Sequence, residues 1–136
     1  ALYNMAAVND STAEAVVDAM TSFDKELILY VPYGSVIAKK ALDRDIPIKY
    51  EAFADRNYNN NLTLVSRKLD NAVLEDPVQI TEHVVRMIKE KKVKTIVGDF
   101  SIIEAGTLCI HGDNPHAVEI VSQLTKNLKD HSISIE

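Results

Sequence analysis

The sequence predicts an α/β fold in which parallel strands alternate with helices. Short, almost continuous apolar runs are typical of strands that are covered on both faces. Between them lie amphipathic segments with apolar residues every three or four positions, and polar residues suited to capping helices. This alternation favours βαβ units around a parallel sheet. No Gly-rich phosphate loop is present, so the pattern leaves open a flavodoxin-like sheet or part of a β/α barrel.

The first half of the chain is expected to contain two helices and two strands. Ser11 and Glu14 have the spacing of a capping box, which predicts a helix start. Ser35 is a suitable cap for a second helix. The expected elements are a helix over 11–21, a strand over 26–31, a helix over 36–43 and a strand over 46–53. The expected buried positions are Ala13, Val16, Val17 and Met20 in the first helix and Val36, Ile37 and Leu42 in the second.

The second half begins with a polar segment over 54–76, and long loops in compact domains are usually functional or disordered. Asp76 and Pro77 then provide a cap and a proline at the first helical position. Asp113-Asn114-Pro115 predicts the same for the last helix. The expected elements are a helix over 77–91, strands over 95–98 and 107–110, a helix after Pro115, and a short strand or frayed tail over 132–136. The expected buried positions are Ile80, Val84, Val85 and Ile88 in the first helix and Ala117, Val118, Val121, Leu124 and Leu128 in the last.

The composition argues against several classes of protein. The 136 residues carry a formal net charge of −5, and the densest basic run, Lys89 to Lys94, is interrupted by Glu90 and Val93. Phosphate-binding surfaces need clustered Lys and Arg with stacking aromatics, so we expect no nucleic-acid partner. No apolar stretch reaches the roughly 18 residues of a membrane span, so we expect no membrane partner. Cys109 is the single cysteine, which favours a reducing, cytoplasmic location.

Polar side chains follow two of the predicted strands. Glu51, Asp55 and Arg56 lie at or beyond the end of one, and His111 and Asp113 follow another. In β/α barrels the carboxyl ends of the strands carry the active site, so these side chains can converge. A carboxylate, an imidazole and a guanidinium are sufficient for general acid–base chemistry and for orienting an anionic substrate.

Each cluster also has a structural interpretation. Gly112 would allow a turn, Asp113 or Asn114 would cap the last helix, and His111 would be a partly buried, hydrogen-bonded residue. The charged residues after the earlier strand would form an ion pair that holds the loop. Metal binding has little support, because His111 and Asp113 supply at most two ligands. The remaining histidines lie on predicted helices without a partner at ligand spacing: His83, His116 and His131.

Five blocks of the chain resemble segments of the LamB/YcsF family, in the family's order. Residues 1–4 resemble the end of Lys-Pro-His-Gly-Ala-Leu-Tyr-Asn, and residues 51–58 resemble Glu-x-Phe-Ala-Asp-Arg-x-Tyr. Residues 63–67 resemble Thr-Leu-Val-Pro-Arg, and residues 72–77 resemble Ala-Val-Ile-x-Asp-Pro. Residues 107–115 resemble Thr-Ile-Cys-Val-His-Gly-Asp-x-Pro. These blocks span almost the whole chain, so the resemblance is specific.

The resemblance implies a distorted TIM-like β/α barrel of the glycoside hydrolase/deacetylase-like kind. Residues 1–136 would be the C-terminal portion of a single barrel domain whose N-terminal half is absent. It also implies ATP-dependent hydrolysis of a lactam, 5-oxoproline to L-glutamate, by the A subunit of 5-oxoprolinase, which works with B and C subunits. The partners would be 5-oxoproline or a related lactam, those two subunits, and the missing half or a second copy of the chain. The chain alone is expected to be inactive.

The same resemblance implies the site residues. The expected catalytic residues are Asp55, His111, Glu51 and Asp113. The expected substrate-binding residues are Arg56, Arg67, Tyr58 and Asn4. No metal ligand is assigned. Leu62 stands where the family usually has Gly and Ser66 where it has Pro, so the loop over 57–67 is expected to differ in conformation.

Two other functions fit the sequence. The first is a metal-dependent, deacetylase-type hydrolase on the same barrel architecture. The second is a noncatalytic assembly module whose exposed strand edge pairs with a second chain, because unpaired edges favour such association. Elemental analysis would separate the first from a lactam hydrolase, and size measurement in solution would test the second.

Overall fold

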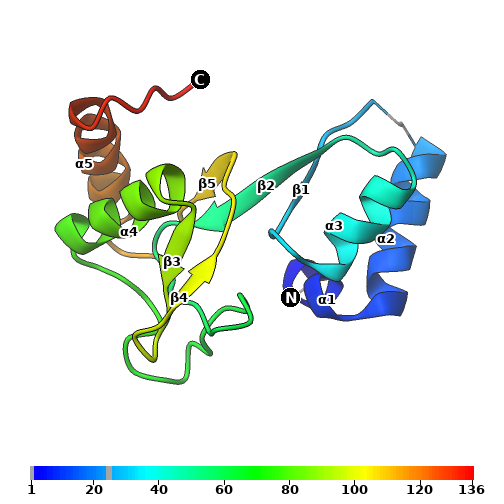
Figure 1. The fold of residues 1–136 in the computed structure, drawn as a ribbon, viewed down its shortest axis with the longest axis horizontal. Coiled ribbons are helices and arrows are strands. Elements are labelled where there is room, and N and C mark those ends of the chain that lie inside the picture. The colour runs from blue at the N-terminus through cyan, green and yellow to red at the C-terminus, as the bar shows by residue number, and fades with distance from the viewer. Residues whose placement is uncertain (1, 24–25) are drawn as a thin grey trace. The chain divides into compact units, whose positions relative to one another are not determined.

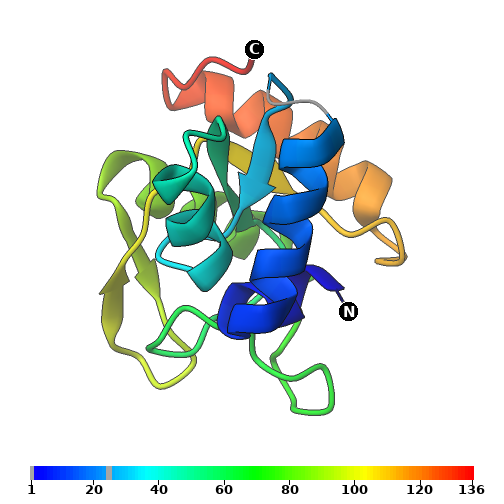
Figure 2. The ribbon, with the colours of Figure 1, turned by 90° about the vertical axis from the view of Figure 1, so that its right-hand side faces the viewer.

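A computed structural model describes residues 2–23 and 26–136, so the contribution of Ala1 to the first family-like block lies outside the described residues. The chain divides into two compact units. The first comprises residues 1–52 and 105–107, and the second comprises residues 53–104 and 108–136. Figure 1 labels their elements and Figure 2 gives a second view.

A three-stranded sheet has the order β1-β2-β5. Its strands are β1 (Leu29–Val31), β2 (Ile48–Phe53) and β5 (Thr107–Cys109). The N–H of Gly106 donates to the carbonyl of Tyr50 at 2.8 Å, and the N–H of Ala54 donates to the carbonyl of Cys109 at 2.9 Å. Residue numbers rise together along both strands, as in a parallel pair. The predicted parallel sheet is therefore confirmed, and its membership of a barrel stays a prediction.

In the first unit three helices pack against one another, and the third contacts β1, which runs parallel to β2 with Leu29 opposite Ile48. The helices are α1 (Leu2–Val8), α2 (Asp10–Phe23) and α3 (Val36–Asp43). Their core consists of Ala6, Ala13, Val17, Val31, Ile37, Ala38, Ala41 and Ile46. The predicted stripe of α2 is confirmed, because Ala13 and Val17 are buried and Val16 and Met20 pack against this core.

Local signals in the first unit were partly correct. The helix over 36–43 and its cap are confirmed, since Ser35 Oγ accepts the N–H of Ala38 at 3.2 Å. The predicted start of α2 at Ser11 was wrong, because Asn9 Oδ1 accepts the N–H of Thr12 at 2.9 Å and the helix begins one residue earlier. Leu42 is exposed rather than buried, because the small Ala38 and Ala41 form the inner face of α3.

The first predicted strand is shorter and less covered than expected. It is confined to residues 29–31, and Ile28 lies outside it with an exposed side chain. Within β1 the burial alternates, since Val31 is fully buried and Tyr30 is exposed. The apolar run therefore did not indicate a strand that is covered on both faces within the described residues.

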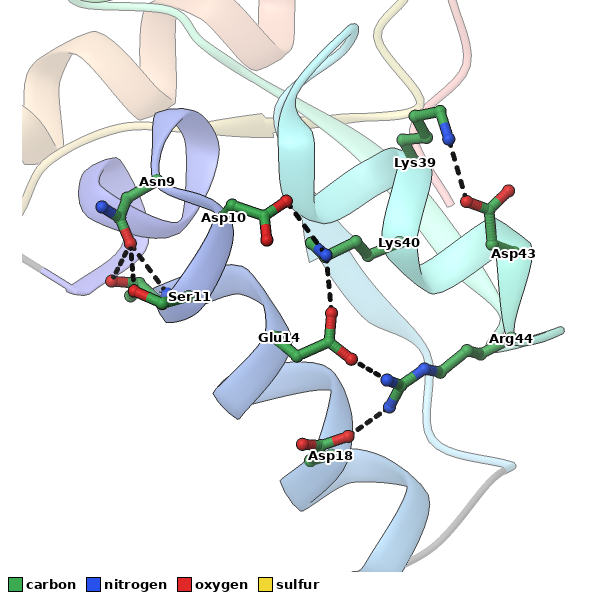
Figure 3. Close-up of polar contacts among 10 residues, drawn as sticks. Asn9, Asp10, Ser11, Glu14, Asp18, Lys39, Lys40, Asp43 and Arg44 are labelled. Carbon is green, nitrogen blue, oxygen red and sulfur yellow. Dashed lines mark hydrogen bonds and ion pairs between the residues drawn. The ribbon is translucent and has the colours of Figure 1, made fainter.

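Ion pairs join α2 to α3 across the first unit (Figure 3). Lys40 Nζ lies 2.6 Å from Glu14 Oε2 and 3.0 Å from Asp10 Oδ1. Arg44 contacts Glu14 and Asp18. Glu14 of α2 therefore contacts two cations of the neighbouring helix, Lys40 within α3 and Arg44 at the C-cap of α3, and links the two helices.

The second unit pairs two amphipathic helices and a hairpin. Its regular elements are α4 (Pro77–Lys89), β3 (Lys92–Lys94), β4 (Phe100–Ile102) and α5 (Ala117–Asp130). The predicted start of α4 is confirmed, because the Asp76 side chain accepts the N–H of Val78 at 3.1 Å and Pro77 is the first helical residue. Of its predicted stripe, Ile80 and Val84 are fully buried. In this part of the chain α4 packs against both α5 and β3.

The predicted strand over 95–98 was wrong. β3 precedes it and pairs antiparallel with β4, with Val93 opposite Ser101, so this pair also departs from a purely parallel pattern (Figure 1). Gly98 has φ +93°, a conformation that favours glycine, and residues 96–98 form the turn. The apolar side chain of Val97 is consequently 70% exposed at the hairpin tip.

The inner face of the last helix was predicted only in part. Leu124 and Leu128 are buried as predicted, together with Ile120, whereas Val118 and Val121 are exposed and Ala117 is partly buried. The helix begins at Ala117, two residues after Pro115, and His116 at the N-cap makes no side-chain capping bond. The tail over 132–136 has no regular structure, so the strand alternative was wrong.

His83 lies in the core of the second unit, on the inner face of α4. Its ring is 6.1 Å from that of Tyr58, and its Nε2 is buried with no hydrogen-bond partner among the described residues. Burial lowers the pKa of His83 to about 4, although a hydrogen bond to the Arg56 backbone acts in the opposite direction. His83, which the sequence places on a helix without a partner at ligand spacing, is therefore a core residue.

No helix within 2–23 and 26–136 combines the length and apolar character that crossing a bilayer requires.

We expect Glu14→Gln to lower the free energy of unfolding by about 1 kcal/mol, because the change weakens contacts to both Lys40 and Arg44. The matched control is Asp43→Asn, which removes the exposed ion pair with Lys39 and should cost less than about 0.5 kcal/mol. Urea unfolding of each variant measures the difference. Equal losses in the two variants would contradict a specific role of Glu14.

The neutral form of His83 is favoured on folding, because its pKa is about 4 in the folded state against 6.5 for a free side chain. The unfolded chain therefore binds the proton more readily, so this contribution to stability is present above pH 6.5 and is lost as the pH falls from 6.5 to 4. The loss should reach about 3 kcal/mol.

This loss can be measured by urea unfolding between pH 4.5 and 7.5. We expect His83→Leu to flatten the pH dependence and the exposed-site control His116→Gln to leave it unchanged. A His83→Leu profile parallel to the wild-type profile would refute the assignment.

Candidate active site at the ends of two strands

Asp55 and His111 contact each other just beyond the ends of β2 and β5. The Oδ1 atom of Asp55 lies 2.9 Å from His111 Nδ1, and Oδ2 accepts the backbone N–H of His111 at 3.1 Å. Each residue follows its strand by two positions, and neighbouring parallel strands end at the same edge of a sheet. The expected convergence of these two residues is confirmed. Their catalytic roles stay predictions.

This contact determines which nitrogen of His111 can exchange a proton. An ionised carboxylate only accepts hydrogen bonds, so Nδ1 carries the proton and Nε2 keeps its lone pair. Nε2 makes no hydrogen bond within the described part of the chain, and the side chain of His111 is 24% exposed. The ring can therefore act as a base at Nε2.

Asp55 is placed to act through His111. Its side chain is almost completely buried, and both of its oxygens are engaged by His111. A carboxylate in this position holds the imidazole in one tautomer and stabilises the imidazolium that forms on protonation. Direct contact between Asp55 and a substrate is not needed for that role.

The His111 ring also stacks on Phe53, a contact that sequence reasoning missed. The ring centroids are 5.0 Å apart and the rings are inclined by only 15°. Phe53 and Asp55 are two positions apart, the spacing at which side chains of extended chain share a face. That spacing relates Phe53 to Asp55, but it does not specify that Phe53 stacks on His111.

Arg67 and Asp113 form an ion pair near the chain surface. Arg67 Nη1 lies 2.5 Å from Asp113 Oδ2, and Nη2 lies 3.4 Å from Oδ1. Hydrogen bonding to Arg67 lowers the pKa of Asp113, and the same bond raises the pKa of Arg67. Asp113 therefore stays ionised to a lower pH than a free side chain, which suits a counter-ion better than a proton donor. The predicted roles of both residues remain untested.

Arg56 is buried and holds the loop over 54–76. Its Nη2 donates to the carbonyl of Val65 at 2.7 Å and its Nε donates to the carbonyl of Ala72 at 3.2 Å. Burial lowers the pKa of the guanidinium, and the charge of Arg67 acts in the same direction while that of Asp55 opposes it. The interpretation that Arg56 holds the loop is supported, but its hydrogen-bond partners are the backbone carbonyls of Val65 and Ala72 and not a carboxylate. Substrate binding by Arg56 stays a prediction.

Tyr58 and Leu62 organise the same loop. Tyr58 is 4% exposed, and its hydroxyl accepts the N–H of Phe53 at 2.8 Å. Leu62 has φ +65°, in the region that favours glycine, and it stands where the family usually has Gly. The expectation that the loop over 57–67 differs in conformation from the family's loop stays a prediction. Substrate contact by Tyr58 stays a prediction.

The remaining two candidates belong to the first unit. Asn4 is exposed on α1. Glu51 is half-buried in β2 and lines an open depression of about 710 Å³ together with Tyr3, Leu29 and Tyr30. Their contribution to the site of Asp55 and His111 stays a prediction. Among the residues that the structure describes, no three His, Cys, Asp or Glu side chains group as metal ligands.

We expect Arg56→Met to lower the free energy of unfolding by about 2–4 kcal/mol, because the buried carbonyl of Val65 loses the Arg56 donor and the carbonyl of Ala72 keeps the N–H of Asn57 but loses its second donor. Arg67→Met is the matched control, since Arg67 pairs only at the surface, and it should cost less than about 1 kcal/mol. Urea unfolding measures both losses, and limited proteolysis within 57–73 should accelerate in Arg56→Met alone. Equal stability losses would show that Arg56 is not the specific support of the loop.

Comparisons with known proteins place these features in a family. The model of the LamB/YcsF family matches residues 1–136. A 5-oxoprolinase A subunit from Fusobacterium nucleatum subsp. nucleatum is 41% identical over 136 residues, which is 100% of this chain and 53% of that protein. The 5-oxoprolinase A subunit from Pyrococcus horikoshii is 39% identical over 99% of this chain and 53% of its own length.

The similarity extends to three dimensions. The crystal structure of a lactam utilization protein from Thermus thermophilus matches with a TM-score of 0.89 and 30% sequence identity, over 99% of this chain and 53% of that one. The chain thus spans about half the length of these relatives. Because the family model matches residues 1–136 of the chain, the chain belongs to the LamB/YcsF family.

Proposed function

We propose that this chain is part of the A subunit of a 5-oxoprolinase and contributes His111 as the proton-transfer group in opening a lactam ring. Relatives about 40% identical carry the name of the 5-oxoprolinase A subunit, and the matched solved structure is a lactam utilization protein. The observation that carries the proposal is the hydrogen bond between buried Asp55 and the half-buried His111 ring. A cytoplasmic location, expected from the single cysteine, belongs to the same proposal.

The pair can serve both halves of the reaction. Opening 5-oxoproline adds water across the lactam C–N bond, so hydroxide goes to the carbonyl carbon and a proton goes to the nitrogen. In the proposal, His111 Nε2 accepts the proton of the attacking water. The imidazolium, stabilised by Asp55, then donates that proton to the leaving nitrogen. Proton balance is complete within the pair and the substrate.

Arg67 is the better placed of the two arginines to bind the carboxylate of the substrate. The side chain of Arg67 is 47% exposed, whereas Arg56 is buried and donates to two carbonyls. Arginine suits planar, two-point recognition of a carboxylate. In this scheme Asp113 is the counter-ion of Arg67 in the absence of substrate, and Arg56 keeps the loop that carries Arg67 in place.

In the proposal, the partner B and C subunits bind ATP and use its hydrolysis to drive ring opening. The sequence of this chain has no Gly-rich phosphate loop, so its residues do not make a nucleotide site of that type. The B and C partners and the remaining length of the A subunit belong to the proposal.

The test uses the complete A subunit reconstituted with its partners. Release of glutamate from 5-oxoproline is measured for His111→Gln, Asp55→Asn and, as a control, the exposed-site variant His116→Gln. We expect kcat to fall by about 10²–10⁴-fold in His111→Gln, because general acid–base catalysis is lost. Asp55→Asn should also lower kcat strongly, because an amide no longer selects the tautomer with a proton on Nδ1.

His116→Gln should retain the wild-type rate. Wild-type rates in both His111→Gln and Asp55→Asn would eliminate the proposed roles. A loss in KM alone, with kcat unchanged, would assign the pair to substrate binding instead.

A further inference from the structure

One hydrogen bond does not hold an imidazole ring in a single orientation. The contact between His111 Nδ1 and Asp55 fixes one atom of the ring, and the ring can still pivot about that bond. The Phe53 ring covers one face of the imidazole at 5.0 Å and nearly parallel to it. A flat aromatic neighbour at this distance opposes the pivot, because tilting the imidazole would drive its edge into the phenyl face.

Phe53 is itself held in an unusual way. It is the last residue of β2 and is 7% exposed. Its N–H donates at 2.8 Å to the hydroxyl of Tyr58, five residues ahead. The hydroxyl therefore sets the backbone position from which the phenyl ring projects.

Tyr58 can serve as this anchor because the second unit immobilises it from several sides. Its carbonyl accepts the N–H of Ile96 at 2.8 Å, and it bridges to Leu64 and Thr95. Its ring lies beside that of His83 on α4. With only 4% of its surface exposed, the residue has little freedom to move.

We infer that Phe53 and Tyr58 are positioning residues for His111: the Phe53 ring sets the plane of the imidazole, and the Tyr58 hydroxyl holds Phe53 in register. In this inference Tyr58 supports the site through its hydrogen bond to Phe53 and not through direct contact with the substrate. The consequence for catalysis rests on the proposed function, whereas the effect on the geometry of the His111 ring does not.

The variants separate the ring from the hydroxyl. Phe53→Leu removes the aromatic face, Phe53→Tyr keeps it, and Tyr58→Phe removes a single hydroxyl. Phe100→Leu is the matched control, because Phe100 is an exposed aromatic residue of β4 in the same unit. Circular dichroism and urea unfolding establish that each variant is folded under the conditions used.

The first readout is independent of activity. In the chain labelled with ¹⁵N-histidine, the wild-type His111 ring should show the tautomer protonated at Nδ1 and ring-proton resonances displaced upfield by Phe53. Phe53→Leu should abolish the displacement and lower the fraction of that tautomer, and Phe53→Tyr should preserve both. Unchanged His111 signals in Phe53→Leu would overturn the inference, whatever the activity.

The second readout is kcat for glutamate release in the reconstituted enzyme. We expect kcat to fall by about 10-fold in Phe53→Leu and about 3-fold in Tyr58→Phe, with KM changed less than about 2-fold, because the ordering of a catalytic group is affected and not substrate binding. Phe53→Tyr should recover most of the rate, and Phe100→Leu should match the wild type. If Phe53→Leu fails to fold, Tyr58→Phe decides: wild-type ring signals and kcat in it overturn the inference.

The two proposals fail in different ways. Altered His111 signals in Phe53→Leu combined with a wild-type rate in His111→Gln would support the positioning contact and refute the proposed function. Unaltered His111 signals in Phe53→Leu combined with an inactive His111→Gln would refute the positioning contact and support the proposed function.

Discussion

The carboxylate of Asp55 accepts two hydrogen bonds from the same residue, and the candidate site depends on this arrangement. One bond comes from the ring of His111 and the other from its backbone. A buried carboxylate without partners would be very unfavourable, so occupying both oxygens is what allows Asp55 to lie inside the second unit. The backbone of Asp55 accepts a further bond from the N–H of Leu74, which ties the same turn to the end of the loop. The contact that orients His111 is therefore also a structural junction.

Around this junction the two arginines differ by burial. Arg56 is buried and donates to the carbonyls of Val65 and Ala72, and the Ala72 carbonyl also accepts the N–H of Asn57. Arg67 lies further along the same loop and pairs with Asp113 at the surface. The buried guanidinium of Arg56 thus holds the loop that carries the accessible guanidinium of Arg67. This division explains why two arginines eleven positions apart need not share one role.

The predicted capping residues are confirmed at α3 and α4 but not at α2 and α5. Ser35 and Asp76 cap α3 and α4 as predicted, since each lies directly before its helix and accepts a backbone N–H of the first turn. Before α2, Asn9 precedes Ser11, and its carboxamide oxygen accepts the N–H of Thr12. Before α5, the Asn114 side chain accepts the N–H of His116, and the helix begins at Ala117.

By itself the sequence determined the α/β class, the parallel pairing of the strands that precede Asp55 and His111, and the family, because these follow from apolar runs and from ordered motif blocks. Only the tertiary structure decided how the polar residues divide into roles. Burial and partners depend on contacts between segments far apart in the chain, such as Arg56 with Ala72 and Asp55 with His111. The stacking of Phe53 on His111 is of the same kind, since no local pattern specifies which side chain covers the face of an imidazole fifty-eight residues away.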